Sequence, residues 1–174
     1  MIESFAMNET RTLLLNGKQV EQRISRLAYQ IYEDNAMETE IILAGIVKSG
    51  YQLCEKIASN IRTISPLNVI LTEVKVDKHS QLNTDILISL NKDQLKGKVI
   101  ILVDDVLNSG KTMMFALKPF LNADIKKIRT VVLIDRNHKR FPIAADFTGL
   151  SLSTTLQEHI SVEFSTDGIF AWLS

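Results

Sequence analysis

The sequence predicts an α/β protein built on a doubly wound, mostly parallel sheet. Two continuous apolar runs, Val99–Val103 (VIILV) and Ile128–Ile134 (IRTVVLI), are typical of strands buried on both faces of such a sheet. An amphipathic segment with helical spacing extends from Gly17 to about Asn35. Because strands and helices alternate along the chain, we expect helices to cover both faces of the sheet.

The first predicted helix begins at Gly17, where Asn16 can cap its exposed N–H groups. The apolar residues that recur at helical spacing in it are Val20, Ile24, Leu27, Ala28 and Ile31. A strand is predicted next at Glu40–Ile46 (EIILAGI), followed by a polar turn, Lys48-Ser49-Gly50. Helical spacing then returns from Tyr51 to Ile61.

The second half of the chain repeats this alternation. Further predicted elements are a strand at Leu67–Val76, the strand Val99–Val103, a helix at Lys111–Leu121, the strand Ile128–Ile134 and shorter strands at Ser161–Phe164 and Ile169–Leu173. In open α/β sheets ligands bind beyond the carboxyl ends of the strands. The loops after Ile46, Val76, Val103 and Ile134 are therefore expected to face one cleft.

Composition narrows the class of protein. The 174 residues are 45% hydrophobic, which favours a single domain over 1–174, with residues 1–13 as an N-terminal arm. Twenty basic and twenty acidic residues give no net charge, so binding of nucleic acid would need a local basic patch. Cys54 stands alone in an apolar helical pattern, which predicts a buried thiol and a cytoplasmic location. The apolar runs are too short to span a membrane.

The most informative segment is Ile100–Thr112 (IILVDDVLNSGKT), in which an apolar strand leads to Asp104 and Asp105 and then to a small polar loop. The loop, Ser109-Gly110-Lys111-Thr112, offers backbone N–H groups, hydroxyls and a cation, which suit a phosphate group. Ionised carboxylates only accept hydrogen bonds, so the two aspartates suit ribose hydroxyls or Mg²⁺. The spacing predicts a sugar subsite beside a phosphate subsite.

Simpler interpretations of these motifs remain open from the sequence alone. Asp104-Asp105 could be a solvated turn that caps the next helix, and Lys48-Ser49-Gly50 a plain strand-to-helix turn. A Walker A nucleotide-binding loop is disfavoured, because that motif needs glycine where Asp105 stands. His138 lies in a polar run and could be an ordinary exposed histidine.

The segment VIILVDDVLNSGKT resembles the binding motif for 5-phosphoribosyl-1-pyrophosphate (PRPP) of type I phosphoribosyltransferases. The likeness extends over roughly residues 14–164 to the PyrR family, proteins with uracil phosphoribosyltransferase activity that in some bacteria also regulate pyrimidine genes by binding RNA. Three further segments follow that family's order and spacing: LLNGKQVEQRISRLAYQIYEDN, GIVKSGYQLCEKIA and VLIDRNHKRFPIAADFTG.

The resemblance implies the type I phosphoribosyltransferase fold, with a small hood, and transfer of phosphoribosyl from PRPP to a nucleobase, with uracil as the leading candidate. Mg²⁺ would accompany PRPP on Asp104 and Asp105, and the protein would be a homodimer or homotetramer. Ribose-phosphate binding is implied for Asp104, Asp105, Leu107, Asn108, Ser109, Gly110, Lys111 and Thr112. Pyrophosphate binding is implied for Val47, Lys48, Ser49 and Gly50, and a base-binding hood for Asp135, Arg136, His138 and Ile143.

Three departures from the family pattern keep alternative functions open. The central loop reads Asn-Ser-Gly-Lys-Thr where the family has Tyr-Thr-Gly-Arg-Thr. The sequence found here is closer to that of purine salvage enzymes. The family's catalytic Tyr-Arg-Asp loop is replaced by Asp77-Lys78-His79, which leaves Lys78 to supply catalytic charge. Arg26 and His138 fall at RNA-binding positions, but Tyr29 replaces a histidine. A purine phosphoribosyltransferase and a regulatory RNA- or nucleotide-binding protein with weak catalysis are the alternatives.

Overall fold

A computed structural model describes residues 11–76, 86–155 and 157–174. In this part of the chain six strands form one sheet, in the order β4-β3-β2-β5-β6-β7. From one edge to the other they are β4 (Ile86–Ile88), β3 (Asn68–Val76), β2 (Glu40–Ile46), β5 (Val99–Leu107), β6 (Lys127–Asp135) and β7 (Phe147–Ser151). Neighbouring strands are parallel except for the edge pair β3 and β4. The predicted mostly parallel sheet is confirmed.

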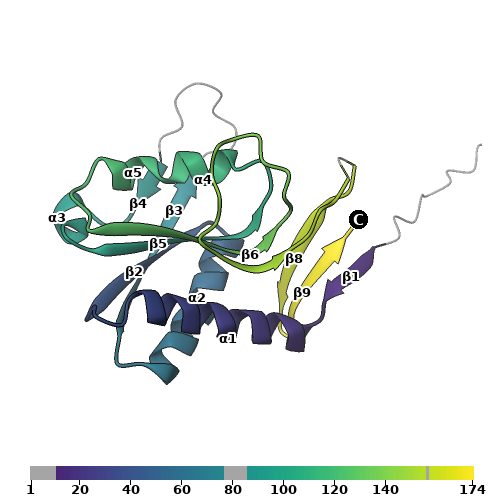
Figure 1. Cartoon of the computed structure of the whole chain (residues 1–174), viewed down its shortest axis with the longest axis horizontal. Coiled ribbons are helices and arrows are strands. Elements are labelled where there is room, and N and C mark those ends of the chain that lie inside the picture. Colours follow the sequence, from purple (N-terminus) through teal and green to yellow (C-terminus); the bar gives the residue numbers. More distant parts are fainter. Residues whose placement is uncertain (1–10, 77–85, 156) are drawn as a thin grey trace, which may run out of the picture.

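Helices cover both faces of this sheet, as a doubly wound fold requires (Figure 1). One face carries α1 (Gly17–Asp34) and α2 (Ser49–Ile64), and the other carries α3 (Lys92–Leu95), α4 (Lys111–Ala116) and α5 (Lys118–Leu121). A hydrophobic core lies on each face of the sheet, and β5 contributes side chains to both. Ile101 and Val103 pack with α1 and α2, whereas Ile100 and Leu102 pack with α4 and α5. None of the helices in the described ranges is long and apolar enough to cross a membrane.

A second, small sheet brings the two ends of the described chain together. It consists of β1 (Thr12–Leu15), β9 (Gly168–Leu173) and β8 (Ile160–Ser165), all antiparallel, in the order β1-β9-β8. Strand β1 was not predicted, because four residues carry little pattern and their partner lies at the other end of the chain. Thr12 and Leu13 of the expected arm therefore belong to a strand, and residues 1–10 lie outside the described part.

Several element boundaries differ from prediction for local reasons. Helix α1 has the expected cap, since Asn16 accepts from the N–H of Gln19. Helix α2 begins at Ser49, two residues earlier than expected, which shortens the polar turn. The helix predicted over Lys111–Leu121 is two short helices that meet at Leu117, because Pro119 lacks an N–H and restricts the residue before it.

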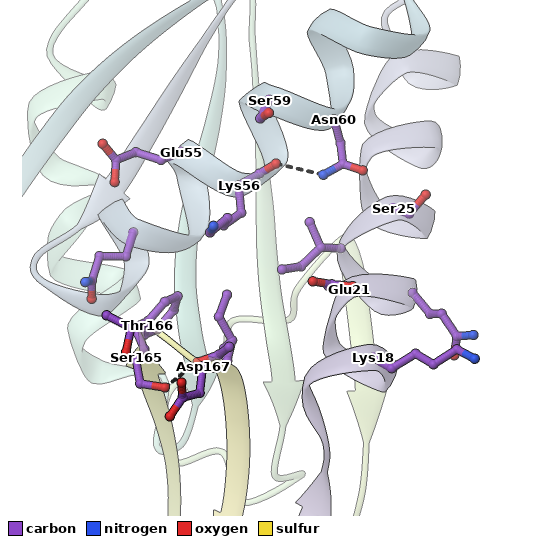
Figure 2. Close-up of a pocket in the computed structure, with 16 residues that line it drawn as sticks. Lys18, Glu21, Ser25, Glu55, Lys56, Ser59, Asn60, Ser165, Thr166 and Asp167 are labelled. Carbon is purple, nitrogen blue, oxygen red and sulfur yellow. Dashed lines mark hydrogen bonds between the residues drawn. The ribbon is translucent and has the colours of Figure 1, made fainter.

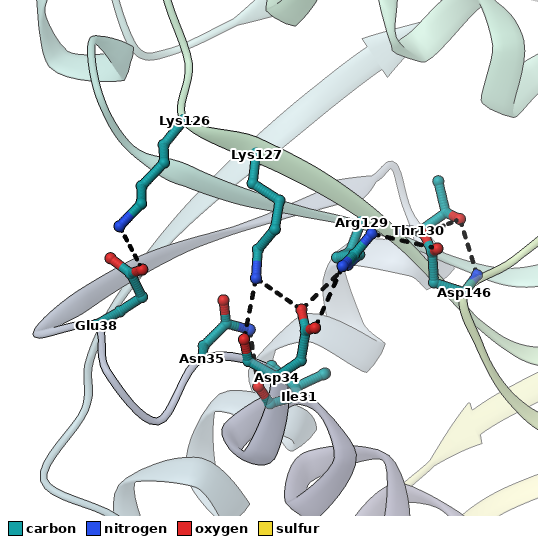
Figure 3. Close-up of polar contacts among 9 residues, drawn as sticks. All are labelled: Ile31, Asp34, Asn35, Glu38, Lys126, Lys127, Arg129, Thr130 and Asp146. Atoms are coloured by element: carbon teal, nitrogen blue, oxygen red, sulfur yellow. Dashed lines mark hydrogen bonds and ion pairs between the residues drawn. The ribbon is translucent and has the colours of Figure 1, made fainter.

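Ion pairs tie the end of α1 and the amino ends of the strands together, at the edge of the sheet opposite the predicted cleft (Figure 3). The Asp34 carboxylate accepts from Lys127 Nζ at 2.8 Å and from Arg129 Nε at 3.1 Å. Lys98 Nζ lies 2.6 Å from Glu40 at the start of β2. The hydrogen bond from Arg129, together with Lys127, lowers the pKa of Asp34 below its usual value, and Lys98 does the same for Glu40.

This network predicts acid sensitivity of the fold. Because the folded pKa of Asp34 lies below its ordinary 3.8 and that of Glu40 below 4.5, their contribution to stability is present above those values and is lost as pH falls through the lowered pKa. The urea midpoint should fall between about pH 5 and about pH 3. Asp34→Asn should flatten that fall, whereas Asp124→Asn, in the exposed turn after α5, should leave it unchanged. Equal pH profiles for wild type and Asp34→Asn would contradict this.

Candidate functional site

A pocket of about 110 Å³ lies where β2 and β5 end. Segments predicted separately meet there, since Val47 and Ser49 follow β2, whereas the other lining residues belong to β5, to the start of α4 and to the loop between them. Those lining residues are Asp104, Asp105, Val106, Leu107, Asn108, Ser109, Gly110, Thr112 and Met113. Of the four loops expected to face one cleft, those after β2 and β5 line this pocket, and the loop after Ile134 does not. The loop that follows Val76, including Lys78, lies outside the described residues.

The two aspartates are strand residues rather than loop residues, because β5 continues to Leu107. Asp104 Oδ1 accepts from the N–H of Asp105 at 3.0 Å, and Asp105 Oδ1 from that of Val106 at 2.9 Å. Val103 and Val106 pack in the same apolar cluster although they are three residues apart. Strict strand alternation would place them on opposite faces, so the pattern slips by one residue at the aspartates. Both half-buried carboxylates consequently line one pocket.

The polar loop after the strand is shaped by Gly110. This residue has φ 85°, a left-handed conformation that favours glycine, and an added Cβ would lie 2.5 Å from Ile143 Cγ2. Gly110 precedes α4 without a side-chain cap, so the interpretation of Asp104-Asp105 as a helix cap is wrong. The carbonyl of Ser109 accepts from the N–H groups of Arg140 and Phe141, at 2.9 and 3.0 Å. These two hydrogen bonds hold the loop against the segment at Arg140 and Phe141, while Ser109 and Thr112 line the pocket.

The predicted pyrophosphate loop approaches β5 closely because of two glycines. A Cβ on Gly50 would lie 2.6 Å from the carbonyl oxygen of Val103, and one on Gly45 would lie 2.4 Å from Tyr51 Cα. The first turn of α2 is therefore in direct contact with the end of β5, beside Asp104. The Val47–Lys48 peptide bond is cis. Val47 and Ser49 line the pocket, whereas Lys48 is exposed and Gly50 is buried beneath it.

The predicted base-binding residues lie next to this pocket but do not line it. Asp135 is buried, with its carboxylate 3.0 Å from Lys139 Nζ and accepting from the N–H of Asn137. The Arg136 side chain donates to Asn108 Oδ1 at 3.1 Å, and His138 Nε2 bonds the carbonyl of Thr154. His138 is half-buried, so the exposed-histidine interpretation is wrong. Lys111 is exposed and also lies outside the lining.

Sequence reasoning missed two residues of the pocket wall, Val106 and Met113. Both are apolar residues within regular elements, so nothing in the pattern separates them from core residues. Cys54 behaves as predicted, since it is fully buried and burial, with Asp104 nearby, raises the pKa of its thiol well above the usual value. A thiol with a raised pKa is a poor nucleophile.

The carboxylate pair fits a magnesium ion that arrives with a phosphorylated ligand. No cluster of three or more His, Cys, Asp or Glu side chains occurs among the described residues, so these residues present no complete metal cage. Mg²⁺ usually binds through one or two carboxylates together with substrate phosphates and water. Asp104 and Asp105, adjacent on one pocket wall, meet that requirement.

A larger hollow of about 1180 Å³ lies elsewhere, between α1, α2 and the turn that joins β8 to β9 (Figure 2). Charges of both signs surround it, including Lys18, Glu21, Glu55, Lys56 and Asp167. None of the predicted site residues in the described ranges lines it. The smaller pocket is therefore the candidate site, because the motif residues converge there.

Comparisons with known proteins show the family of the chain. Residues 11–167 match the family described as phosphoribosyl transferase domain. The chain is 34% identical over 161 residues to the bifunctional protein PyrR of Clostridium kluyveri, covering 89% of this chain and 91% of that protein. It is 32% identical over 157 residues to the PyrR of Haemophilus ducreyi, covering 86% and 88%.

Solved structures share the fold. The hypoxanthine phosphoribosyltransferase of Trypanosoma cruzi aligns with a TM-score of 0.75 over 92% of this chain and 95% of that chain, at 15% identity. A hypoxanthine-guanine phosphoribosyltransferase of Bacillus anthracis aligns with a TM-score of 0.73 over 86% of each chain, at 21% identity. At such identities the likeness concerns the fold, including the parallel sheet and the helices on both of its faces.

Proposed function

We propose that this chain, which belongs to the phosphoribosyl transferase domain family and within it to the PyrR-like proteins, transfers the phosphoribosyl group of PRPP to a nucleobase, with uracil as the leading candidate. The observation that carries the proposal is the convergence of two carboxylates and a small polar loop on one pocket of about 110 Å³. The carboxylates suit ribose hydroxyls, and the loop suits a 5-phosphate.

In this reaction a ring nitrogen of the base forms a bond to the anomeric carbon as the bond from that carbon to pyrophosphate breaks. Asp104 and Asp105 would orient the ribose, and the loop from Ser109 to Thr112 would hold the 5-phosphate. Val47 and Ser49, which line the pocket, and the exposed Lys48 would meet the leaving pyrophosphate. Mg²⁺ held by the aspartates would neutralise charge on the leaving group. Positioning and electrostatics would supply most of the rate enhancement.

A base-panel assay tests the proposal. The protein is incubated with PRPP, Mg²⁺ and uracil, guanine, hypoxanthine or adenine, and nucleoside monophosphate and pyrophosphate are quantified. We expect uridine monophosphate as the main product, and in a mixture of uracil and guanine we expect uracil to be consumed first. Predominant guanosine monophosphate would identify a purine transferase instead. Absence of product with every base, in protein shown to be folded by circular dichroism, would refute transfer to these nucleobases.

A second function, regulation through RNA, is favoured by one feature of the surface. Arg23 Nη1 and Arg26 Nη2 both donate to the carbonyl oxygen of Gly149 on edge strand β7, at 3.1 and 2.7 Å. Neither guanidinium has an ion pair within the described ranges, so their positive charge is not neutralised locally. Such a pair can contact the phosphates of a nucleic acid.

Titration with uracil-rich RNA at physiological salt tests this function. We expect Arg26→Ala to weaken binding about five-fold and to reduce its salt dependence, because about one phosphate contact is removed. Arg62→Ala, on helix α2, serves as the control. No measurable RNA affinity in the wild type would remove the regulatory function.

A further inference from the structure

The guanidinium of Arg136 connects the phosphate loop to a segment that is distant in the sequence. Its Nη1 donates to Asn108 Oδ1 at 3.1 Å, in the loop that follows β5. Its Nε donates to Thr154 Oγ1 at 2.9 Å, and its Nη2 donates to the carbonyls of Thr155 and Glu158, at 3.1 and 2.6 Å. One side chain thus holds two loops at once.

The two loops lie at the same edge of the main sheet. Strands β5, β6 and β7 are parallel neighbours, so Asn108, Arg136 and the segment after Ser151 all follow the carboxyl ends of their strands. The segment that carries Thr154, Thr155 and Glu158 is the connection from β7 to β8, and hence from the main sheet to the small sheet. The connection is therefore attached at the carboxyl ends of the strands, the same edge at which the candidate pocket lies.

The Arg136 guanidinium donates hydrogen bonds to neutral acceptors. It has no ion pair in the described part of the chain, and its four acceptors are an amide, a hydroxyl and two carbonyls. The planar guanidinium fork suits such fixed, divergent acceptors, which a lysine could not satisfy together. Within the connection, the N–H of Thr155 donates to Glu158 Oε2 at 2.6 Å.

A second contact reinforces the same link. His138 Nε2 bonds the carbonyl of Thr154, and the backbone N–H of Arg136 donates to the carbonyl of Leu107 at 3.1 Å. The loop after β6 is therefore attached on one side to the end of β5 and on the other to the connection toward β8. Asn108 and Arg136 therefore join the phosphate loop to the connection through hydrogen bonds.

We infer that Arg136 is a positioning residue that makes base binding depend on occupation of the phosphate loop, through its bonds to Asn108 and to the segment from Thr154 to Glu158. The inference rests on the proposed transferase function. A 5-phosphate that fixes the loop would fix Asn108, and Arg136 would then hold the connection in the position that accepts the base. Its expected signature is a selective effect on base affinity at saturating PRPP.

The kinetic test is a double-mutant cycle with Asn108→Ala and Arg136→Ala. Each single change should raise the KM for the base about ten-fold, the loss expected for hydrogen bonds to a charged group. Arg136 does not line the pocket, so Arg136→Ala should change the KM for PRPP less than about three-fold. The double variant should resemble the single ones, because both changes break one link. Asn108→Asp keeps the acceptor oxygen and should restore the base KM. Arg140→Ala, an exposed arginine of the same loop, is the matched control.

Hydrogen exchange with PRPP as the probe gives a second readout that needs no turnover. In the wild type, PRPP should protect peptides covering 106–113 and 152–160. In Asn108→Ala, which removes only one of the four bonds and should fold, protection should persist in the first peptide and be lost in the second.

Additive effects of the two substitutions on the base KM would overturn the inference, and so would unchanged protection of the second peptide in Asn108→Ala. If PRPP protected neither peptide in the wild type, the proposed function itself would fail, and the inference with it. If the first peptide alone were protected in the wild type, the transferase proposal would stand and the coupling would be refuted.

Discussion

Replacing Asp105 by asparagine should reduce kcat/KM for PRPP by about 100-fold while leaving the fold intact. The amide has nearly the same shape, but it loses the negative charge and one acceptor oxygen that would bind ribose hydroxyls or Mg²⁺. Asp105 is half-buried at the pocket wall and its described bond is a local one, to the N–H of Val106. The melting temperature should therefore stay within about 3 °C of the wild type.

Steady-state kinetics with varied PRPP, together with calorimetric titration of PRPP, measure this effect. Asp124→Asn makes the same chemical change in an exposed turn remote from the motif and should leave both quantities unaltered. A fall of more than about 8 °C in melting temperature for Asp105→Asn would show that the carboxylate is mainly structural. Unchanged kinetics would remove Asp105 from the site.

Replacing Gly50 by alanine should lower the free energy of unfolding by about 3 kcal/mol and abolish PRPP binding. The new Cβ would lie 2.6 Å from the Val103 carbonyl oxygen and 3.2 Å from Asp104 Cα, and both are backbone atoms that cannot rotate away. Helix α2 would have to move outward, which would separate Val47 and Ser49 from the carboxylates.

Gly17→Ala is the matched control, because its added Cβ would meet its nearest neighbour, Phe170 Cζ, at an ordinary 3.8 Å in the first turn of α1. Its stability should equal or slightly exceed that of the wild type, since alanine favours the helix. Urea unfolding followed by circular dichroism measures both variants. Equal stability of Gly50→Ala and Gly17→Ala would contradict the close approach of α2 to β5.

The parts of the fold that the sequence predicts well are those whose pattern is local and strong. The helix with Asn16 at its cap and the strand Glu40–Ile46 agree with the structure, because helical spacing or continuous burial marks them. Strands β1, β4 and β7 were missed, since they are short or lie at sheet edges and depend on partners far along the chain. The end of β5 was missed because its carboxylates resemble a loop.

In the candidate site, too, the residues that were predicted well are those that lie together in the sequence. Asp104, Asp105 and the loop to Thr112 are contiguous in the sequence, so one motif indicated them together. The meeting of that motif with Val47 and Ser49 was predicted only through the family resemblance and the rule for parallel strands. The contacts of Arg136 with Thr154, Thr155 and Glu158 are set by the path of the chain between β7 and β8. No spacing in the sequence reports them.

The pairing of β1 with β9 has a consequence for biosynthesis. Strand β1 leaves the ribosome before the strands of the main sheet, whereas its partner β9 follows all of them in the chain, and Arg11 bonds Ser161 across 150 positions. The nascent chain can assemble the strands from Glu40 to Ser151 before the small sheet has its central strand. The small sheet can close only after β9 has also emerged, so a nascent chain that extends only to Ser151 would carry the strands of the candidate pocket without the central strand of the small sheet.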